Sequence, residues 1–407
     1  MNKLLIATAS TLVIAAAAYA NESDIDQNGT GNTAEVDQTG GAEGTASINQ
    51  GNVFAAPNDE ANNSFAKITQ SEVSVGSPGF SVPTNSATIN QTGENMGALV
   101  EQRNYNGNGA TNVVVIDQAS NGAGPTTAGG YSQEAVATQF GEGNTADIDQ
   151  GQTNASPPPN RSGQQITVNQ TGDFNASTSD QRGNEANASI TQSGAMNVSG
   201  VAQIGLEDFA VVTQSGNGNE SSISQSGNFN DAFVTQSGDG NISGVVQDGG
   251  AQSSLATVNQ DGSSNESNIL QTDIIGGAPV PPRSSNIAFV SQLGDRGSST
   301  IRQGGATNGN NDAQVFQVGA DETSVIEQTG DRNLALVSSQ SGGGNYSLIV
   351  QPGSDNEARV DQASGDNFSD VFQSGSFNEA DVNQLSTSGN VSYVTQNGTG
   401  NMAMVNQ

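Results

Sequence analysis

Glutamine marks a regular pattern in which polar and apolar residues alternate along most of the chain. Thirty glutamines form the series, from Gln27 to Gln407, and 18 of the 29 intervals between them are eleven residues long. Ile or Val stands two residues before the Gln in 27 of the 30 copies, Ala or Ser four before it in 27, and Asn six before it in 19. Gly stands two residues after the Gln in 21 of the 29 copies that extend so far. An alternation of period two that ends in a turn residue predicts short β-strands joined by tight turns.

An eleven-residue period is also typical of right-handed helical supercoils, but the spacing of the apolar residues argues against helices. A helix would bury apolar residues three and four positions apart, whereas this pattern places them two apart. A Gly in nearly every copy would also destabilise a helix by about 1 kcal/mol each time. We therefore expect strands rather than helices.

The Ala/Ser position indicates that the structural repeat is a pair of strands. From residue 177 onward this position holds Ser and Ala in strict alternation, except that Leu336 stands in an Ala position, in the copy that ends at Gln340. Two kinds of strand therefore occupy two environments, and the repeat unit is about 22 residues long. We predict an all-β fold, an amyloid-like β-solenoid of about 15 stacked strand–turn–strand coils with two facing, parallel, in-register sheets.

The Asn, Ala/Ser, Val/Ile and Gln positions of each copy are expected to point inward. A buried amide destabilises a fold unless it is paired, and in-register stacking lets each amide hydrogen-bond to the same residue of the next coil. These amides are the candidate functional residues, and such ladders suit either a polymer or a closed solenoid. The predicted ladder glutamines are Gln170, Gln181, Gln192, Gln203, Gln214, Gln225, Gln236, Gln247, Gln351, Gln362, Gln373, Gln384, Gln396 and Gln407. The predicted ladder asparagines are Asn175, Asn197, Asn219, Asn230, Asn241, Asn356, Asn367, Asn378 and Asn401.

The first 20 residues resemble a signal peptide. Lys3 precedes an apolar stretch that is too short to favour a membrane anchor, and Ala18-Tyr19-Ala20 provides a small-x-small cleavage site. No later segment is long and apolar enough to span a bilayer, so we expect no transmembrane segment in the mature chain.

The mature chain is predicted to have two parts. Residues 21–169 carry irregular repeats with proline-rich loop inserts, and residues 170–407 carry regular repeats of about 22 residues. Ten of the 11 prolines fall in the five longest intervals, where proline favours loops over ladder strands. A degenerate strand in residues 51–69 or 71–90 is an alternative to a simple loop there. The loops could bind a ligand or serve only as spacers.

Composition limits the chemistry that this chain could perform. Its 407 residues include no His and no Cys, which excludes nucleophiles that need a His partner, the usual zinc sites and disulfide bonds. With 41 acidic and 10 basic residues the formal net charge is −31, which argues against binding to nucleic acid or anionic lipid. The acidic residues are spread over many copies rather than paired in one groove. We therefore expect no enzyme, no metal site and no cofactor.

The repeat Q-x-G-x-x-N-x-A-x-V-x-Q resembles the repeat of the curlin family. The stretches from Gln139 to Gln150 and from Gln225 to Gln236 show it clearly, and the similarity extends over essentially all of residues 21–407. Curlins are the subunits of curli, the extracellular amyloid fibres of Gram-negative biofilms. The resemblance implies that the ladder glutamines and asparagines form the core of a homopolymer fibre outside the cell. It also implies a nucleator subunit, an outer-membrane export pore, and roles in adhesion and biofilm matrix.

We therefore expect a secreted structural subunit of a curli-like functional amyloid, which self-assembles end to end into a cell-surface fibre. The mature chain offers no residues to cap a terminal coil, so open strand edges are expected at both ends. The alternative is a monomeric or surface-tethered β-solenoid that acts as an adhesin or ligand-binding protein. The repeats typical of calcium-binding solenoids are absent from the sequence.

Overall fold

The computed structural model shows an all-β protein built from short strands. It describes residues 21–39, 44–51, 61–62, 64–72, 84–93, 96–104, 110–119, 133–151, 163–248, 253–272, 285–304, 309–339 and 342–407. The expected signal peptide and the ten prolines of the long intervals lie outside these ranges. Within them, no helix has the length and hydrophobicity that a membrane crossing requires.

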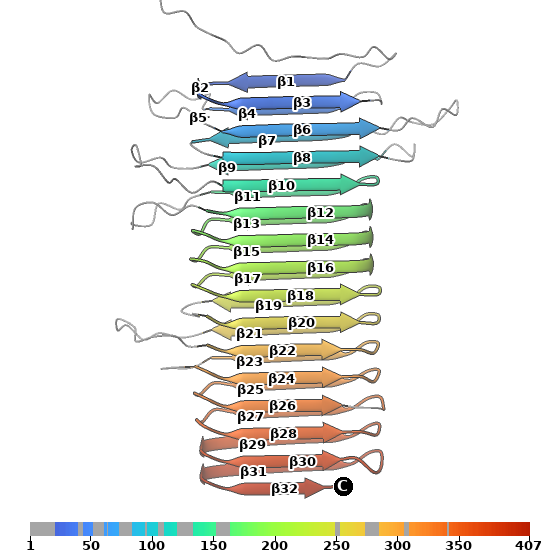
Figure 1. The fold of residues 1–407 in the computed structure, drawn as a ribbon. Coiled ribbons are helices and arrows are strands. Elements are labelled where there is room, and N and C mark those ends of the chain that lie inside the picture. The colour runs from blue at the N-terminus through green and yellow to red at the C-terminus, as the bar shows by residue number, and fades with distance from the viewer. Residues whose placement is uncertain are drawn as a thin grey trace, which may run out of the picture. The chain divides into compact units, whose positions relative to one another are not determined.

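Two parallel 15-stranded sheets contain nearly all of the described strands, drawn as stacked arrows in Figure 1. The first sheet contains β1 (Glu22–Gln27), β4 (Thr45–Gln50), β7 (Asn85–Thr92), β9 (Asn112–Ala119), β11 (Thr145–Gln150), β13 (Ala176–Gln181), β15 (Val198–Gln203), β17 (Glu220–Gln225), β19 (Ile242–Asp248), β21 (Glu266–Thr272), β23 (Ser298–Gln303), β25 (Thr323–Gln328), β27 (Tyr346–Gln351), β29 (Phe368–Ser376) and β31 (Val391–Thr399). The second sheet contains β3 (Thr33–Thr39), β6 (Phe65–Glu72), β8 (Met96–Asn104), β10 (Gln133–Phe140), β12 (Gln165–Asp173), β14 (Asn187–Ala195), β16 (Phe209–Asn217), β18 (Asp231–Ser237), β20 (Leu255–Asp261), β22 (Ile287–Gln292), β24 (Asp312–Gln317), β26 (Leu334–Ser339), β28 (Glu357–Gln362), β30 (Glu379–Gln384) and β32 (Met402–Asn406). The predicted β-solenoid of strand–turn–strand coils is confirmed.

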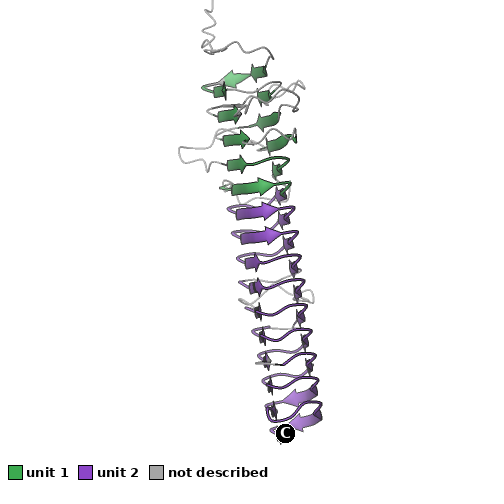
Figure 2. Ribbon diagram, turned by 90° about the vertical axis from the view of Figure 1, so that its right-hand side faces the viewer, with its two compact units in different colours: residues 1–175 green, residues 176–407 purple. Residues whose placement is uncertain are grey.

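The chain divides into two compact units, Met1–Asn175 and Ala176–Gln407, coloured separately in Figure 2. In each unit the strands alternate between the two sheets, so that a coil is one strand of the first sheet, a turn and one strand of the second. Strands of successive coils pair in parallel and in register: Ala188 lies opposite Ala210, and Ala210 lies opposite Ala232. Equivalent residues in this regular part are 22 positions apart, as the sequence period predicts.

Inward-facing side chains form rows that run from coil to coil within each unit. In the second unit the Ser positions all lie in the first sheet and the Ala positions in the second, which explains their alternation in the sequence. Between them lie Val and Ile side chains such as Ile190 and Val212, both with no exposed surface. Burial of each such side chain contributes about 1.5–3 kcal/mol before the loss of conformational entropy is subtracted.

Small residues let successive turns approach each other closely. The Gly two positions after the Gln is needed because a Cβ on Gly194, which has a φ of +106°, would overlap the carbonyl oxygen of Gly216 in the next coil. Two residues after that Gly, the residue before the Asn adopts a left-handed conformation in several coils, as in Phe229 with a φ of 60°. This conformation strains a non-Gly residue, so the surrounding hydrogen bonds must hold the turn in place.

The register of β26 corrects one assignment made from the sequence. The pattern placed Leu336 in the Ala position and Gln340 in the Gln position. In the structure Ala335 takes the Ala position, and Ser339 lies opposite Gln317 in the Gln row. The expected position of Gln340 was therefore wrong by one residue, and Gln340 itself lies outside the described residues.

The register differs because the residues one position before those that the pattern assigned fit three of the core rows better. Asn333, Ala335 and Val337 then occupy the Asn, Ala and Val rows and are almost fully buried, with 1 %, 0 % and 0 % exposure. The alternative register would put Leu336 into a row of alanines, and such overpacking typically destabilises a core by about 1–3 kcal/mol. With Ala335 in place, the alternation of Ser and Ala has no exception after residue 177.

The long intervals of the N-terminal part add no further strand to either main sheet within the described residues. Between Gln50 and Gln70 the structure shows β5 (Ala61–Asn62), which pairs with β2 (Gly29–Thr30) in a separate two-stranded sheet. The middle of the next interval, residues 73–83, lies outside the described part of the chain.

Candidate functional site: the stacked amide rows

Glutamines at the ends of the strands form a hydrogen-bonded row in each sheet of each unit, and we call these the Gln rows. Gln192 Nε2 donates to Gln214 Oε1 at 2.8 Å, and Gln214 Nε2 donates to Gln236 Oε1 at the same distance. The second N–H of each amide donates across the coil to a backbone carbonyl of the other sheet, as Gln214 does to Val198 O at 2.9 Å. Both amide protons and the oxygen are therefore used, although the side chains are buried.

The Gln-to-Gln hydrogen bonds have nearly uniform lengths in both units. They are 2.7–2.9 Å long in the first unit. In the second unit they are 2.8–3.0 Å long. In every one of these bonds the donor belongs to the earlier coil and the acceptor to the later coil, so the row has a direction.

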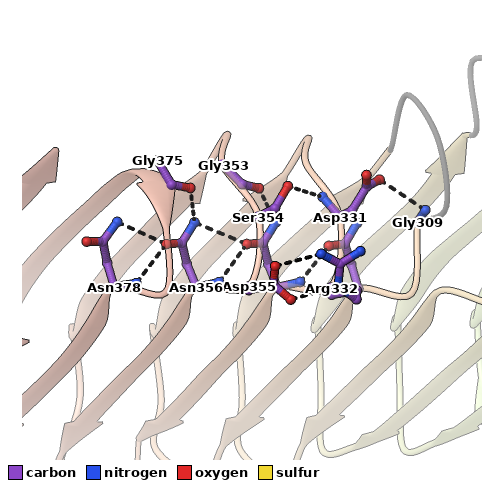
Figure 3. A network of polar contacts seen from close by, with 11 residues as sticks. Gly309, Asp331, Arg332, Gly353, Ser354, Asp355, Asn356, Gly375 and Asn378 are labelled. Carbon is purple, nitrogen blue, oxygen red and sulfur yellow. Dashed lines mark hydrogen bonds and ion pairs between the residues drawn. The ribbon is translucent and has the colours of Figure 1, made fainter. Parts of the chain in front are cut away.

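Asparagines at the starts of the strands form a second pair of rows, the Asn rows. Asn378 donates both its backbone N–H and its side-chain amide to Asn356 Oδ1, each at 3.0 Å (Figure 3). The Asn356 amide in turn donates to the carbonyl oxygen of Gly375 in the next turn at 3.2 Å. The Asn rows therefore fasten each turn to the turns of the two neighbouring coils.

The structure places every predicted ladder residue in one of these four rows. The Gln row of the first sheet contains Gln181, Gln203, Gln225, Gln247, Gln351, Gln373 and Gln396, and that of the second sheet contains Gln170, Gln192, Gln214, Gln236, Gln362, Gln384 and Gln407. The Asn row of the first sheet contains Asn175, Asn197, Asn219, Asn241 and Asn367, and that of the second contains Asn230, Asn356, Asn378 and Asn401. These contacts lie within one chain; the role of the rows in a fibre core is a proposal.

One Gln row is interrupted at Ser339, a position that the sequence pattern did not reveal. Without an amide to meet in the next coil, Gln317 donates across the core to the hydroxyl of Ser324 at 2.9 Å. On the other side of the gap, the hydroxyl of Ser347 donates to Gln362 Oε1 at 3.4 Å. The Ser positions of the first sheet thus supply substitute partners where the opposite Gln row is broken.

Two acidic side chains replace asparagine in the Asn rows, one in each sheet, and both are 1 % exposed. Glu322 accepts a hydrogen bond from the Asn345 amide at 3.3 Å. Asp208 accepts one from the Asn230 backbone N–H at 3.0 Å. Burial raises the pKa of the Asp208 carboxyl to about 7, and the charge of Asp231 acts in the same direction. Both acids stand six residues before a ladder Gln, so their offset was visible in the sequence although their burial was not.

Exposed ion pairs link successive turns outside the core. Arg332 contacts Asp355 through two hydrogen bonds, Nε to Oδ1 at 2.7 Å and Nη2 to Oδ2 at 2.6 Å (Figure 3). This contact lowers the pKa of the Asp355 carboxyl. Asp331 on the same turn accepts a hydrogen bond from the Gly309 backbone at 3.2 Å. Such exposed pairs contribute little to stability, but they align neighbouring turns.

The chemical capacity of the site is that of a hydrogen-bonding template. The rows present uncharged amides at a fixed repeat. In the Gln rows the earlier coil donates to the later one, whereas in the Asn rows the amide of the later coil donates to Oδ1 of the earlier one. Among the residues that the structure describes there is no group of three or more acidic side chains arranged to hold a metal ion. The arrangement is suited to binding another coil of the same kind.

Comparison with known proteins identifies the repeat. Residues 216–249 and 339–363 match the family model described as the curlin associated repeat. No curated protein matches the chain. The matched stretches span β17 to β19, and β27 and β28, which carry the same four rows as the other coils of their unit. These two stretches are therefore similar to the curlin associated repeat, which supports a curlin-family protein.

Proposed function

We propose that this protein is a secreted structural subunit of a curli-like functional amyloid fibre, in which copies stack end to end at the cell surface. The observation that carries the proposal is the construction of the amide rows. Nearly all of the inward glutamines pair with the glutamine of the neighbouring coil, with the donor on the earlier coil, and the Asn rows link neighbouring coils with the opposite polarity. A second copy that presents the same rows in register would continue the pattern across the junction between chains.

The exposure of β31 and β32 supports this proposal. Each of these strands has one hydrogen-bonded strand neighbour among the described residues. Their inward positions are less covered than those of inner coils: Gln407 and Asn401 are exposed, whereas Gln362 and Asn356 have 0 % and 1 % exposure. Full burial of these rows therefore requires a coil on both sides, which another copy would provide.

The energetic gain from stacking comes from the same groups. A new junction would bury two Val or Ile side chains per coil, at about 1.5–3 kcal/mol each, and would pair the two Gln and two Asn positions. These gains must exceed the loss of translational and rotational freedom on association. Backbone pairing along both strands of the coil adds the hydrogen bonds that make cross-β assemblies stable.

The match of two stretches to the curlin associated repeat supports an extracellular location. Curlin-family proteins are extracellular surface fibres, so adhesion and biofilm matrix formation are the roles that we propose for this chain. A nucleator subunit and an outer-membrane export pore are the partners that we propose on the same ground.

Electron microscopy of the purified chain tests the proposal. After removal of denaturant we expect unbranched fibres one solenoid wide, with a strand spacing of about 4.8 Å along the fibre axis by X-ray diffraction. Soluble particles that stay one molecule long would contradict it and would favour a monomeric solenoid adhesin.

Two variants of β32 sharpen the test. Val405→Asp places a charge at an inward position that would be buried at a junction, and it should prevent fibre growth because burying an unpaired charge is costly. Met404→Asp is the matched control, since Met404 points outward and is 65 % exposed. This variant should still form fibres. Equal fibre growth by both variants would argue against stacking through this coil.

A further inference from the structure

Asp208 is the residue from which we draw a further inference. It places a carboxyl group where most coils have an asparagine amide, while its strand keeps the register of the row. It stands at the start of β16, six residues before Gln214, where most other coils have Asn. Its side chain is 1 % exposed. The same position holds Ala186 in the coil before and Asn230 in the coil after.

One carboxyl oxygen of Asp208 behaves as the amide oxygen of an asparagine would. Oδ1 accepts the backbone N–H of Asn230 at 3.0 Å. In the regular rows Asn197 Oδ1 accepts the backbone N–H of Asn219 at the same distance. The acceptor half of the row is therefore intact at Asp208.

The other oxygen stands where an asparagine has its donor. Asn197 and Asn219 each donate the side-chain N–H to the carbonyl oxygen of the Gly 19 residues later, Gly216 and Gly238, at 2.9 and 2.8 Å. At Asp208 the equivalent acceptor is the carbonyl of Gly227. Oδ2 of Asp208 has no hydrogen-bond partner among the residues that the structure describes.

The packing around Gly205 shows that the two oxygens are neighbours. A Cβ built on Gly205 would overlap both Gly227 O and Asp208 Oδ2, so both atoms border the same point. Two oxygen acceptors that face each other without a proton repel. A proton on Oδ2 would turn the same geometry into an O–H···O hydrogen bond to Gly227.

We propose that Asp208 is a proton-operated lock in the Asn row of the second sheet. When a proton from solvent binds Oδ2, the neutral acid donates to Gly227 O and completes the row as an asparagine would. When the proton leaves, the carboxylate faces a carbonyl oxygen and the β16 coil is held less firmly to β18. The effect on the solenoid does not depend on fibre formation; any effect on fibre growth rests on the function proposed above.

The surroundings of Asp208 favour the protonated form near neutral pH. Burial is the main cause that raises its pKa to about 7, and the charge of Asp231 on β18 adds to it. The hydrogen bond from the Asn230 backbone N–H, with the nearby Gly205 N–H and Asn230 amide, acts in the opposite direction and lowers the pKa.

The other charged groups of these turns are more negative than positive. Glu207 lies beside Asp208 in the chain, and the preceding coil carries Glu185 and Arg182. Arg182 contacts Asp180 of the same strand end at 2.8 Å, so the Asp180 charge offsets much of the Arg182 charge. The local field therefore adds no strong stabilisation of the carboxylate.

The direction of the pH effect follows from the raised pKa. The folded state holds the proton up to about pH 7, whereas an unfolded aspartate releases it near its ordinary value of 3.8. Stability is therefore lost as the pH rises from about 4 to about 7, and this group causes no further loss above that range.

Urea unfolding of the full chain between pH 5 and pH 8.5 tests the proposal, with wild type, Asp208→Asn and Asp231→Asn compared. Asp208→Asn replaces the lock by a permanent donor. Relative to this variant, the wild-type unfolding constant should increase on the order of 100-fold between pH 5 and pH 8. Asp231→Asn should keep most of this pH dependence.

Infrared spectroscopy provides a second readout that does not depend on unfolding. The wild-type spectrum minus the Asp208→Asn spectrum should show the carbonyl band of a protonated carboxyl at pH 6, and the band should be lost above pH 8. A constant ratio of unfolding constants, or no such band at pH 6, would overturn the proposal. Both readouts can be taken on soluble protein, so failure to form fibres would contradict the proposed function and leave this inference standing.

Discussion

Replacing Ser324 by Ala is predicted to destabilise the solenoid because Ser339 interrupts the Gln row on the opposite sheet. Gln317 has no amide to meet at the position of Ser339, and it donates instead to Ser324 Oγ at 2.9 Å. Its other N–H donates to Ser298 O at 3.1 Å. The Ser324→Ala variant removes the first of these partners and leaves a buried N–H without one.

The expected magnitude follows from the burial of Gln317, which is 1 % exposed. Leaving a buried donor unsatisfied typically costs about 1–3 kcal/mol of folding free energy. Restoring the row by Ser339→Gln should remove most of that cost, because Gln317 could then donate to the new amide. A coupling free energy of about 1–2 kcal/mol between the two substitutions is therefore expected.

The assay is a double-mutant cycle measured by urea unfolding of wild type, both single variants and the double variant. Ser299→Ala is the matched control, since Ser299 occupies the same Ser position one coil before Ser324 and is 1 % exposed. Its hydroxyl has no hydrogen-bond partner within the described part of the chain. Removing it should be neutral or slightly stabilising.

Two results would refute this reasoning. If Ser324→Ala has the same cost with and without Ser339→Gln, the Ser hydroxyl does not substitute for the missing amide. If Ser299→Ala is as destabilising as Ser324→Ala, the Ser positions act through packing alone, and the hydrogen bond from Gln317 contributes nothing measurable.

Two further predictions concern charge and the turns. Removal of residues 1–20 would leave 41 acidic and 9 basic residues. Fibre growth should therefore be faster at high than at low ionic strength, because salt screens repulsion between like charges on stacked coils. Growth rates, measured by light scattering, that do not change with salt would contradict this. Gly194→Ala should lower the urea midpoint far more than Gly218→Ala, because a Cβ at Gly194 would overlap Gly216 O whereas nothing lies within 4 Å of one at Gly218. The left-handed backbone alone, with a φ of +65° at Gly218, should cost that variant about 1–2 kcal/mol, and equal midpoints would argue against close packing of the turns.

Much of the fold was predictable because the same strand-and-turn sequence pattern recurs along most of the chain. Period-two alternation predicted strands, the Gly predicted turns, and the alternation of Ser and Ala predicted two sheets. Inward amides can be buried only if they are paired, so the Gln and Asn rows could be located from the pattern alone. The structure adds their direction, with donors on the earlier coil in the Gln rows and on the later coil in the Asn-to-Asn bonds.

The errors and omissions arose where a single residue departs from the repeat. Gln340 was taken as a row member because Gln was used as the marker, although Asn333, Ala335 and Val337 have the correct offsets for Ser339 to fill that position. The sequence also gives Asp208 its place in the row but not its burial. Whether a polar residue is satisfied depends on its neighbours in the adjoining coils, which lie 22 or more positions away in the sequence.

Mass per length of the assembled fibre, measured by scanning transmission electron microscopy, tests the central claim most directly. If copies stack end to end through their amide rows, the coil repeat continues across each junction. The fibre should then contain one coil, 22 residues in the regular part, per about 4.8 Å of length. A clearly lower value, as for solenoids joined by flexible or loosely packed contacts, would contradict the account.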